Sequence, residues 1–238
     1  MLHIARSVDV SAVRTDVTME ELKSVIQACK RYRFVCAFAM PCYTELLIKG
    51  LAGEPDIAVG GVVGFPSGAD TTSIKVQTAR EMLALGCEEL DMVVNVGALK
   101  SGLRQWVVDD IRAVVDEAGE VPVKSILETA CLTDDEIALG AELAVSAGVR
   151  FVKTGTGWAN KPTKVETIRL IKKTIGDSAL IKAAGGVHTL DTILAMMDAG
   201  CSRFGVSLRS IWTIMREVDA RLGRLDNFEL EAAVGDDY

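Results

Sequence analysis

The chain has 238 residues, of which 49% are hydrophobic and 25% charged, and its formal net charge is −7 at pH 7. A chain of this length can bury a large core and falls in the usual size range of one α/β barrel. The negative charge, with no basic run, argues against a nucleic-acid partner. No apolar run is long enough to cross a membrane, and Arg6 and Asp9 interrupt the apolar core that a secretory signal would need. We therefore expect an intracellular, cytoplasmic protein.

The cysteines and histidines give little support to a metal centre. The six cysteines lie far apart and form no C-x-x-C pair, so we expect them as small buried hydrophobes rather than zinc ligands or redox dithiols. Only His3 and His188 are present. His188 follows a Gly-Gly turn and could approach a ligand, but we expect no metal and no cofactor.

One unit recurs along the chain: a helical segment, a glycine, a short polar link and an apolar run. Gly86, Gly148 and Gly200 each occupy the glycine position. Glycine is the expected residue just after a helix, where the backbone becomes left-handed, so each helix is predicted to end there and to lead directly into a strand. Helix starts are predicted by three capping-box patterns, in which threonine precedes glutamate by three residues, at 18–21, 133–136 and 163–166.

Apolar runs give the candidate strands. They cover residues 7–13, 34–40, 57–65, 90–95, 121–127, 151–154, 180–183 and 203–207. Eight strands that alternate with helices fit a closed (β/α)₈ TIM barrel, whose active site lies at the carboxyl ends of the strands. The competing fold is a doubly wound open sheet, but the G-x-G-x-x-G turn that usually follows its first strand is absent. We predict a single barrel domain over residues 1–224 and a short acidic tail over residues 225–238.

Two lysines stand at the ends of successive apolar runs. Lys153 precedes a glycine-rich turn, and Lys182 repeats this arrangement one unit later. A lysine at the end of a buried strand suits either a cationic contact to an anionic ligand or an amine nucleophile that forms a Schiff base with a carbonyl. If the strands are neighbours, each ammonium group disfavours protonation of the other, and burial acts in the same direction. One lysine could then be a free amine near neutral pH.

Asp91 lies inside an otherwise apolar run. A buried aspartate must be paired, and in a barrel of this order Lys153 and Lys182 are the nearest cations. The pairing is either structural or part of a general acid/base that moves protons during carbinolamine formation and carbon–carbon cleavage. Lys124 and Glu128 flank the fifth run and either complete the charge network or border the site.

Glycine-rich turns follow the last three predicted strands. On this side of a barrel, backbone amides and a helix N-terminus often hold a phosphate, although tight turns alone would also explain the glycines. We interpret these turns as a site for an anionic group of a small-molecule substrate. The candidate contacts are Gly155, Thr156, Gly157, Gly185, Gly186, Gly205 and Ser207.

Several of these stretches resemble the signature sequences of the deoxyribose-phosphate aldolase family. They are FVKTGTG at 151–157, IKAAGGV at 181–187, ELDMVVNVGAL at 89–99 and GFPSGA at 64–69. The resemblance, which extends from about residue 4 to about residue 207, implies a class I aldolase on a TIM barrel. It implies that Lys153 forms the Schiff base, that Lys182 lowers its pKa, and that Asp91 shuttles protons. The implied reaction is the reversible, metal-free cleavage of 2-deoxy-D-ribose 5-phosphate to acetaldehyde and D-glyceraldehyde 3-phosphate.

Some positions depart from the family pattern. Where the family commonly has Asp-His-Thr on the first strand, this chain has Asp9, Val10 and Ser11. The aspartate is kept and is a candidate substrate contact, whereas the histidine is lost and serine replaces threonine. Gly155 stands where the family usually has serine, and Phe38 where it usually has cysteine. After Ser207 the second serine of a phosphate-binding pair is missing, although Arg209 could supply charge instead.

These departures leave alternatives open. The same imine chemistry could act on another short hydroxy-aldehyde or ketose, with or without phosphate, or a non-catalytic barrel could bind a sugar phosphate and use its lysines only as cations. Tyr238, the last residue, is either there by chance or is the C-terminal tyrosine that some family members place in the active site. The resemblance also implies a possible homo-oligomer, a dimer or larger.

Overall fold

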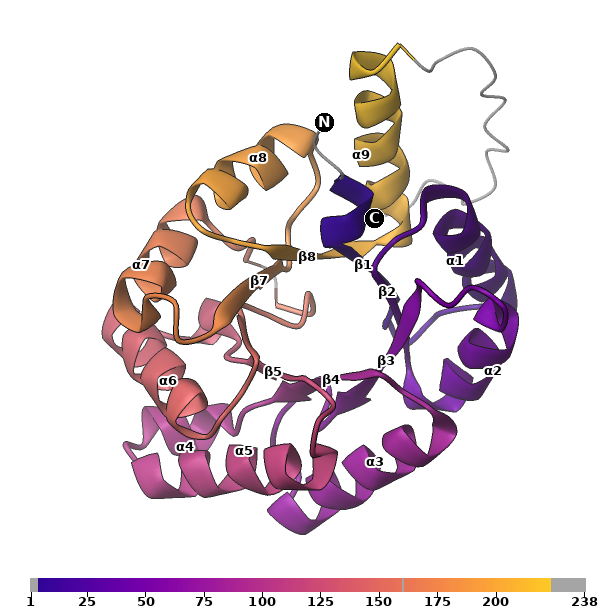
Figure 1. Ribbon diagram of the computed structural model, residues 1–238. Helices are drawn as coiled ribbons and strands as arrows, with labels where there is room; N and C mark the ends of the chain where they lie inside the picture. The colour runs from indigo at the N-terminus through magenta and orange to yellow at the C-terminus, as the bar shows by residue number, and fades with distance from the viewer. Residues whose placement is uncertain (1–3, 160, 224–238) are drawn as a thin grey trace.

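The computed structural model describes residues 4–159 and 161–223, which form a closed barrel of parallel strands in sequence order, ringed by helices (Figure 1). The strands are β1 Val8–Ala12, β2 Cys36–Ala39, β3 Ala58–Val63, β4 Glu89–Val93, β5 Val123–Ile126, β6 Phe151–Lys153, β7 Leu180–Ala184 and β8 Arg203–Ser207. Each agrees with its predicted run to within about two residues at either end. The predicted TIM barrel is confirmed, whereas the predicted tail and Tyr238 lie outside the described residues.

Helices connect successive strands and cover the outside of the barrel. They are α1 Met19–Tyr32, α2 Pro41–Leu51, α3 Thr72–Leu85, α4 Val96–Lys100, α5 Arg104–Ala118, α6 Asp134–Ser146, α7 Val165–Ile175, α8 Leu190–Asp198 and α9 Leu208–Arg221. Gly86, Gly148 and Gly200 follow α3, α6 and α8 with φ values of 103°, 93° and 102°, so the predicted left-handed glycines are confirmed. Within the described part of the chain, no helix is long and apolar enough to span a membrane.

The capping-box predictions had different outcomes. Thr133 and Glu136 form a complete box at the start of α6. Thr18 caps α1 by accepting from the amide of Glu21, while the Glu21 carboxylate pairs with Arg14. The box at Thr163 was wrong, because its hydroxyl donates to the carbonyl of Ala184 at 2.7 Å and α7 begins after Lys164 instead.

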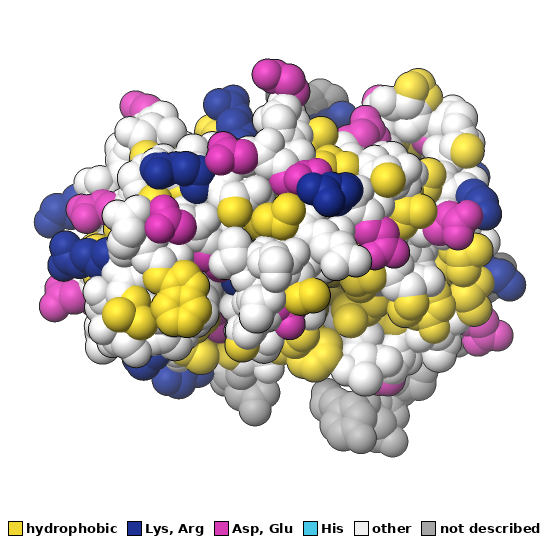
Figure 2. Space-filling view, turned by 90° about the horizontal axis from the view of Figure 1, so that it is seen from below, with side chains coloured by type: hydrophobic (Ala, Val, Ile, Leu, Met, Phe, Trp, Pro, Cys, Tyr) yellow, Lys and Arg dark blue, Asp and Glu magenta, His cyan; other side chains and the backbone are white. Residues whose placement is uncertain are grey.

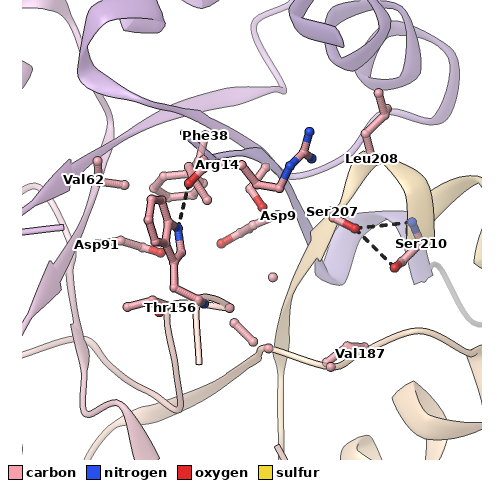
Figure 3. A pocket seen from close by; sticks show the side chains of 18 of the residues that line it. Asp9, Arg14, Phe38, Val62, Asp91, Thr156, Val187, Ser207, Leu208 and Ser210 are labelled. Atoms are coloured by element: carbon pink, nitrogen blue, oxygen red, sulfur yellow. Dashed lines mark hydrogen bonds between the residues drawn. The ribbon is translucent and has the colours of Figure 1, made fainter. Parts of the chain in front are cut away.

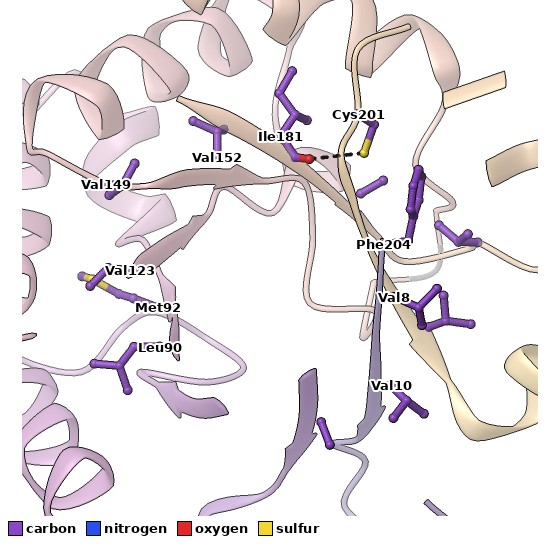
Figure 4. Packing of buried hydrophobic residues seen from close by; sticks show 14 of the residues in the cluster. Val8, Val10, Leu90, Met92, Val123, Val149, Val152, Ile181, Cys201 and Phe204 are labelled. Atoms are coloured by element: carbon purple, nitrogen blue, oxygen red, sulfur yellow. Dashed lines mark hydrogen bonds between the residues drawn. The ribbon is translucent and has the colours of Figure 1, made fainter. Parts of the chain in front are cut away.

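Side chains on the two faces of each strand have different surroundings. Outward-facing residues such as Val10, Leu90 and Ile181 pack beneath the helices in the large apolar core (Figure 4). Inside the barrel, Cys36, Phe38 and Val62 form a small separate apolar cluster. Other inward positions carry charged groups, among them Asp91, Lys153 and Lys182. Alternation along each strand separates these residues from the outer core, since successive residues of a strand point to opposite faces.

The outer surface carries charges of both signs. Figure 2 views the molecule from below and shows basic and acidic side chains interspersed across that face.

Candidate active site

The two predicted lysines lie side by side inside the barrel. β6 pairs with β7 so that Lys153 is directly opposite Lys182. Both donate to the same atom, because Asp91 Oδ2 lies 2.7 Å from the Nζ of Lys153 and 2.7 Å from the Nζ of Lys182. The expected pairing of Asp91 with these two lysines is confirmed.

Further charged residues extend this group toward the amino ends of the strands. Lys124 Nζ faces Asp91 Oδ1 at 3.0 Å and also pairs with Glu89. Asp9 joins the group because its carboxylate binds Lys182 Nζ at 2.7 Å and Arg203 at 2.7 Å. Lys124 therefore completes the charge network, which was one of the two roles considered for it.

The network contains more cations than carboxylates. Among the described residues, its ion pairs join three carboxylates with four cations: Asp9, Glu89, Asp91, Lys124, Lys153, Lys182 and Arg203. The charges of these seven buried or half-buried groups balance when one lysine is neutral.

Lys153 is the lysine of the network that loses its proton most readily. Burial, together with the Lys182 ammonium beside it, lowers the pKa of Lys153 to about 8, although Asp91 opposes the shift. The pKa of Lys124 is raised, since its three carboxylate neighbours outweigh the effect of burial. Lys153 is therefore partly deprotonated close to neutral pH, and a neutral amine is the form that can attack a carbonyl.

The two aspartates of the network remain ionised. Burial raises the pKa of Asp91, but the ammonium groups of Lys124, Lys153 and Lys182 outweigh it and hold the pKa well below its usual range. The pKa of Asp9 is lowered in the same way, with Lys182 as the largest opposing charge to the effect of burial. Both carboxylates thus hold their lysines in place as fixed negative charges.

A cavity of about 390 Å³ opens above the network at the carboxyl ends of the strands. Lys153, which is 7% exposed, Lys182 and Asp91 line its floor. Figure 3 shows Asp91 and Val62 on one side of this cavity, with Ser207 and Ser210 on the other. The space is large enough for a small phosphorylated sugar.

Several predicted ligand contacts gather at the side formed by β7 and β8. Gly157, Gly185, Gly186, Gly205, Ser207 and Arg209 all line the cavity. Gly185 and Gly186 have φ values of 87° and 79°, a conformation that only glycine adopts without strain. Ser207 is the N-cap of α9, so the positive end of the helix dipole faces the same side.

Other predicted contacts have different surroundings. Gly155 faces a small pocket of about 10 Å³ beside Glu128, where an added Cβ would lie 2.9 Å from Glu128 Oε1. Thr156 lines the main cavity, but its hydroxyl donates to Glu128 Oε2 at 2.5 Å. Glu128 therefore borders the site and fixes the turn after Lys153. Asp9, also a predicted ligand contact, lies in the charge network and lines the main cavity.

His188 lies beside the N-terminus of α9. Its Nδ1 is 2.9 Å from the hydroxyl of Ser210, and both residues line the cavity. The structure thus brings His188 to the ligand side, as the Gly-Gly turn before it suggested.

Arg203 and Glu89 were not identified from the sequence. Each lies two residues before an identified candidate on the same strand, Gly205 and Asp91 respectively. Strand alternation places both on the inward face, so the period-two pattern was the signal that could have found them.

A closed barrel with a buried lysine of lowered pKa beside a cavity at the carboxyl ends of its strands suits the class of enzymes that act on carbonyl compounds. The sequence matches the DeoC/LacD family aldolase over residues 7–213. The chain belongs to this family and is an aldolase, a carbon–carbon lyase.

Relatives are similar over most of their length. The deoxyribose-phosphate aldolase of Bacillus mycoides is 40% identical over 228 residues, covering 95% of this chain and 100% of the relative. That of Sinorhizobium medicae is 40% identical over 224 residues, covering 94% and 90%. Among solved structures, the aldolase QR15 has a TM-score of 0.88 at 30% identity, covering 95% of this chain and 100% of its own. The deoxyribose phosphate aldolase of Aeropyrum pernix has a TM-score of 0.81 at 25% identity, covering 91% and 92%.

Proposed function

We propose that the protein reversibly cleaves 2-deoxy-D-ribose 5-phosphate to acetaldehyde and D-glyceraldehyde 3-phosphate through an imine at Lys153. The observation that carries this proposal is the Lys153 amine, which borders the cavity with a pKa of about 8 and lies 2.7 Å from Asp91. The relatives that carry the name deoxyribose-phosphate aldolase support the choice of substrate.

The proposed reaction begins with attack of the neutral Lys153 amine on the C1 aldehyde of the substrate. The resulting carbinolamine loses water to give a protonated imine. When the C2–C3 bond breaks, the imine accepts its electron pair to become an enamine, the C3 hydroxyl gives up its proton to a base, and D-glyceraldehyde 3-phosphate leaves. We assign proton transfer in these steps to Asp91, which rests as the anion and so accepts a proton before it returns it, and to Lys182, whose Nζ lies 2.7 Å from Asp91 Oδ2. Protonation of the enamine and hydrolysis of the imine then release acetaldehyde and restore Lys153.

The substrate phosphate is proposed to bind on the β7–β8 side of the cavity. Gly185, Gly186 and Gly205 let the backbone approach the ligand closely, and the N-terminus of α9 and Arg209 supply positive charge. In this proposed pose the phosphate lies on the β7–β8 side while the aldehyde at the other end of the open-chain sugar meets Lys153.

A second candidate keeps the imine and changes the substrate to another short hydroxy-aldehyde or ketose. It is favoured by Leu208, which borders the cavity next to Ser207 and offers no hydroxyl to a phosphate. Comparison of kcat/KM for phosphorylated and unphosphorylated substrates distinguishes the two candidates.

We further propose that the protein forms a homo-oligomer. The Aeropyrum pernix relative is described as tetrameric, and Ile74, Leu103 and Trp106 are exposed on or beside α3 and α5. Sedimentation velocity over a concentration series tests this point.

The imine is tested by mixing the protein with 2-deoxyribose 5-phosphate and sodium borohydride, followed by peptide mass spectrometry. We expect one reduced adduct, on the peptide that contains Lys153, and no adduct with Lys153→Met. That variant should lose roughly 10⁴-fold or more in kcat, because the nucleophile is removed. Lys49→Met, which alters an exposed lysine, is the control and should behave as the wild type. An adduct on another lysine would contradict the assignment, and failure with a panel of carbonyl compounds would favour a non-catalytic binding protein.

A further inference from the structure

We propose that Phe38 is a positioning residue of the active site, whose ring holds the ammonium groups of Lys124 and Lys182 against Asp91 and keeps water out of the network below the cavity. The proposal rests on the function proposed for Lys153. It concerns a residue on β2, which, like β3, contributes no charged group to the network.

The ring of Phe38 contacts both cations. Lys182 Nζ lies 4.4 Å from the ring centroid and Lys124 Nζ lies 4.7 Å from it. The same two ammonium groups pair with Asp91 at 2.7 and 3.0 Å. The negative face of an aromatic ring attracts cations, and this attraction strengthens when water is excluded. Phe38 and Asp91 therefore both hold Lys124 and Lys182.

The barrel makes room for this ring. Phe38 is opposite Gly60 in the β2–β3 pairing, and a Cβ at Gly60 would overlap the Cε1 and Cζ atoms of Phe38. Phe38 is only 2% exposed and packs with Cys36 and Val62 in the apolar cluster inside the barrel. The ring thus has a defined position, and it fills space that water could otherwise occupy beside the ammonium groups.

The ring of Phe38 affects the pKa of Lys153 indirectly, through the charged groups around the Lys153 amine. The groups facing its amine are Asp91 on β4, Lys124 on β5 and Lys182 on β7, and behind them lie Asp9 on β1, Glu89 on β4 and Arg203 on β8. The positive charge of Lys182 disfavours a second positive charge on Lys153. Water in place of the ring would screen Lys182 and solvate the Lys153 ammonium, and both effects favour protonation of Lys153.

The first test is Phe38→Leu, with Phe204→Leu as the matched control. Phe204 is fully buried on β8 but belongs to the outer core. The rate at which a small acylating reagent modifies Lys153 is measured against pH by peptide mass spectrometry, beside the pH dependence of kcat/KM. We expect the pH midpoint of Lys153 acylation to rise by about half a pH unit to one pH unit in Phe38→Leu, because a cation–π contact is lost and the lysines are less buried. The midpoint should be unchanged in Phe204→Leu.

A second variant separates the charge of the ring from its shape. Replacing Phe38 by 3,5-difluorophenylalanine keeps the size of the side chain but weakens its negative face. We expect a smaller rise of the midpoint with an unchanged melting temperature. Wild-type midpoints in both Phe38 variants, while borohydride still traps an imine on Lys153, would overturn the role of Phe38 alone. Loss of trapping in the wild type would instead overturn the function proposed for Lys153, and the acylation rates would still report on Phe38.

Discussion

Lys75 and Lys182 are both buried lysines paired with an aspartate, but their surroundings differ. Lys75, on α3, lies between the barrel and α5, where its Nζ contacts Asp110 Oδ2 at 2.6 Å and the carbonyl of Val93 at 3.1 Å. The other oxygen of Asp110 accepts from the hydroxyl of Thr72 at 2.8 Å. Among the described residues, Asp110 is the carboxylate paired with Lys75, so this site is balanced.

Lys182 belongs to a group with surplus positive charge. It shares Asp91 with Lys153 and Lys124, and the amine of Lys153 has a pKa of about 8 because it is buried among these cations. Burial is therefore common to both sites, and the balance of charge is not. The barrel site differs in that three lysines share Asp91, in a network with more cations than carboxylates, beside an open cavity.

The largest effect on stability is expected when the balanced pair is broken. Lys75→Met leaves the Asp110 carboxylate buried without its cation, which should lower the free energy of unfolding by about 3–5 kcal/mol. Lys75→Met combined with Asp110→Asn should recover much of this loss, because no uncompensated charge remains. Denaturant unfolding followed by circular dichroism measures both changes.

The same variants test whether the two sites are independent. Below the unfolding transition, Lys75→Met should still give the borohydride adduct on Lys153, since Lys75 lies outside the charge network. A folded Lys75→Met protein without the adduct would show that the two sites are coupled and would break the comparison.

A smaller effect, on catalysis rather than stability, is expected for Lys182→Met. Removal of this cation raises the pKa of Lys153, because repulsion is lost and the negative charge of Asp91 is less compensated. Activity at pH 7 should fall roughly 10- to 100-fold and recover partly at higher pH, as a rise of one to two pKa units implies. Lys182→Arg keeps the charge and is the control. An unshifted pH profile in Lys182→Met would mean that Lys182 does not activate Lys153.

Much of the barrel and its central lysines could be predicted from local patterns. Gly148 and Gly200 mark helix ends through backbone conformation, which depends on neighbouring residues alone. Lys153 and Lys182 could be found because a charge at the end of an apolar run is unusual and the run itself predicts burial. Asp91 was recognisable for the same reason.

Contacts between distant segments could not be predicted in this way. Lys75 lies in an amphipathic helix, where a lysine is typically a solvated surface charge, and its partner Asp110 is 35 residues away. Thr163 has the spacing of a capping box, yet a tertiary contact to Ala184 takes its hydroxyl. Phe38 looks like an ordinary strand residue, since its two cations come from β5 and β7.

The last prediction concerns the pH dependence of Lys153 acylation. It tests the charge balance around Asp91, because two substitutions are expected to shift the pKa of Lys153 in opposite directions. With a pKa of about 8 for Lys153, the rate of acylation of this amine should fall tenfold per unit as pH decreases below that value, because only the neutral form reacts. Asp91 raises the pKa of Lys153, so Asp91→Asn should move the midpoint down, opposite to Lys182→Met. Peptide mass spectrometry of Lys153 at a series of pH values measures both shifts. Movement of both variants in one direction would mean that general loosening of the barrel, rather than the balance of charge around Asp91, determines the reactivity of Lys153.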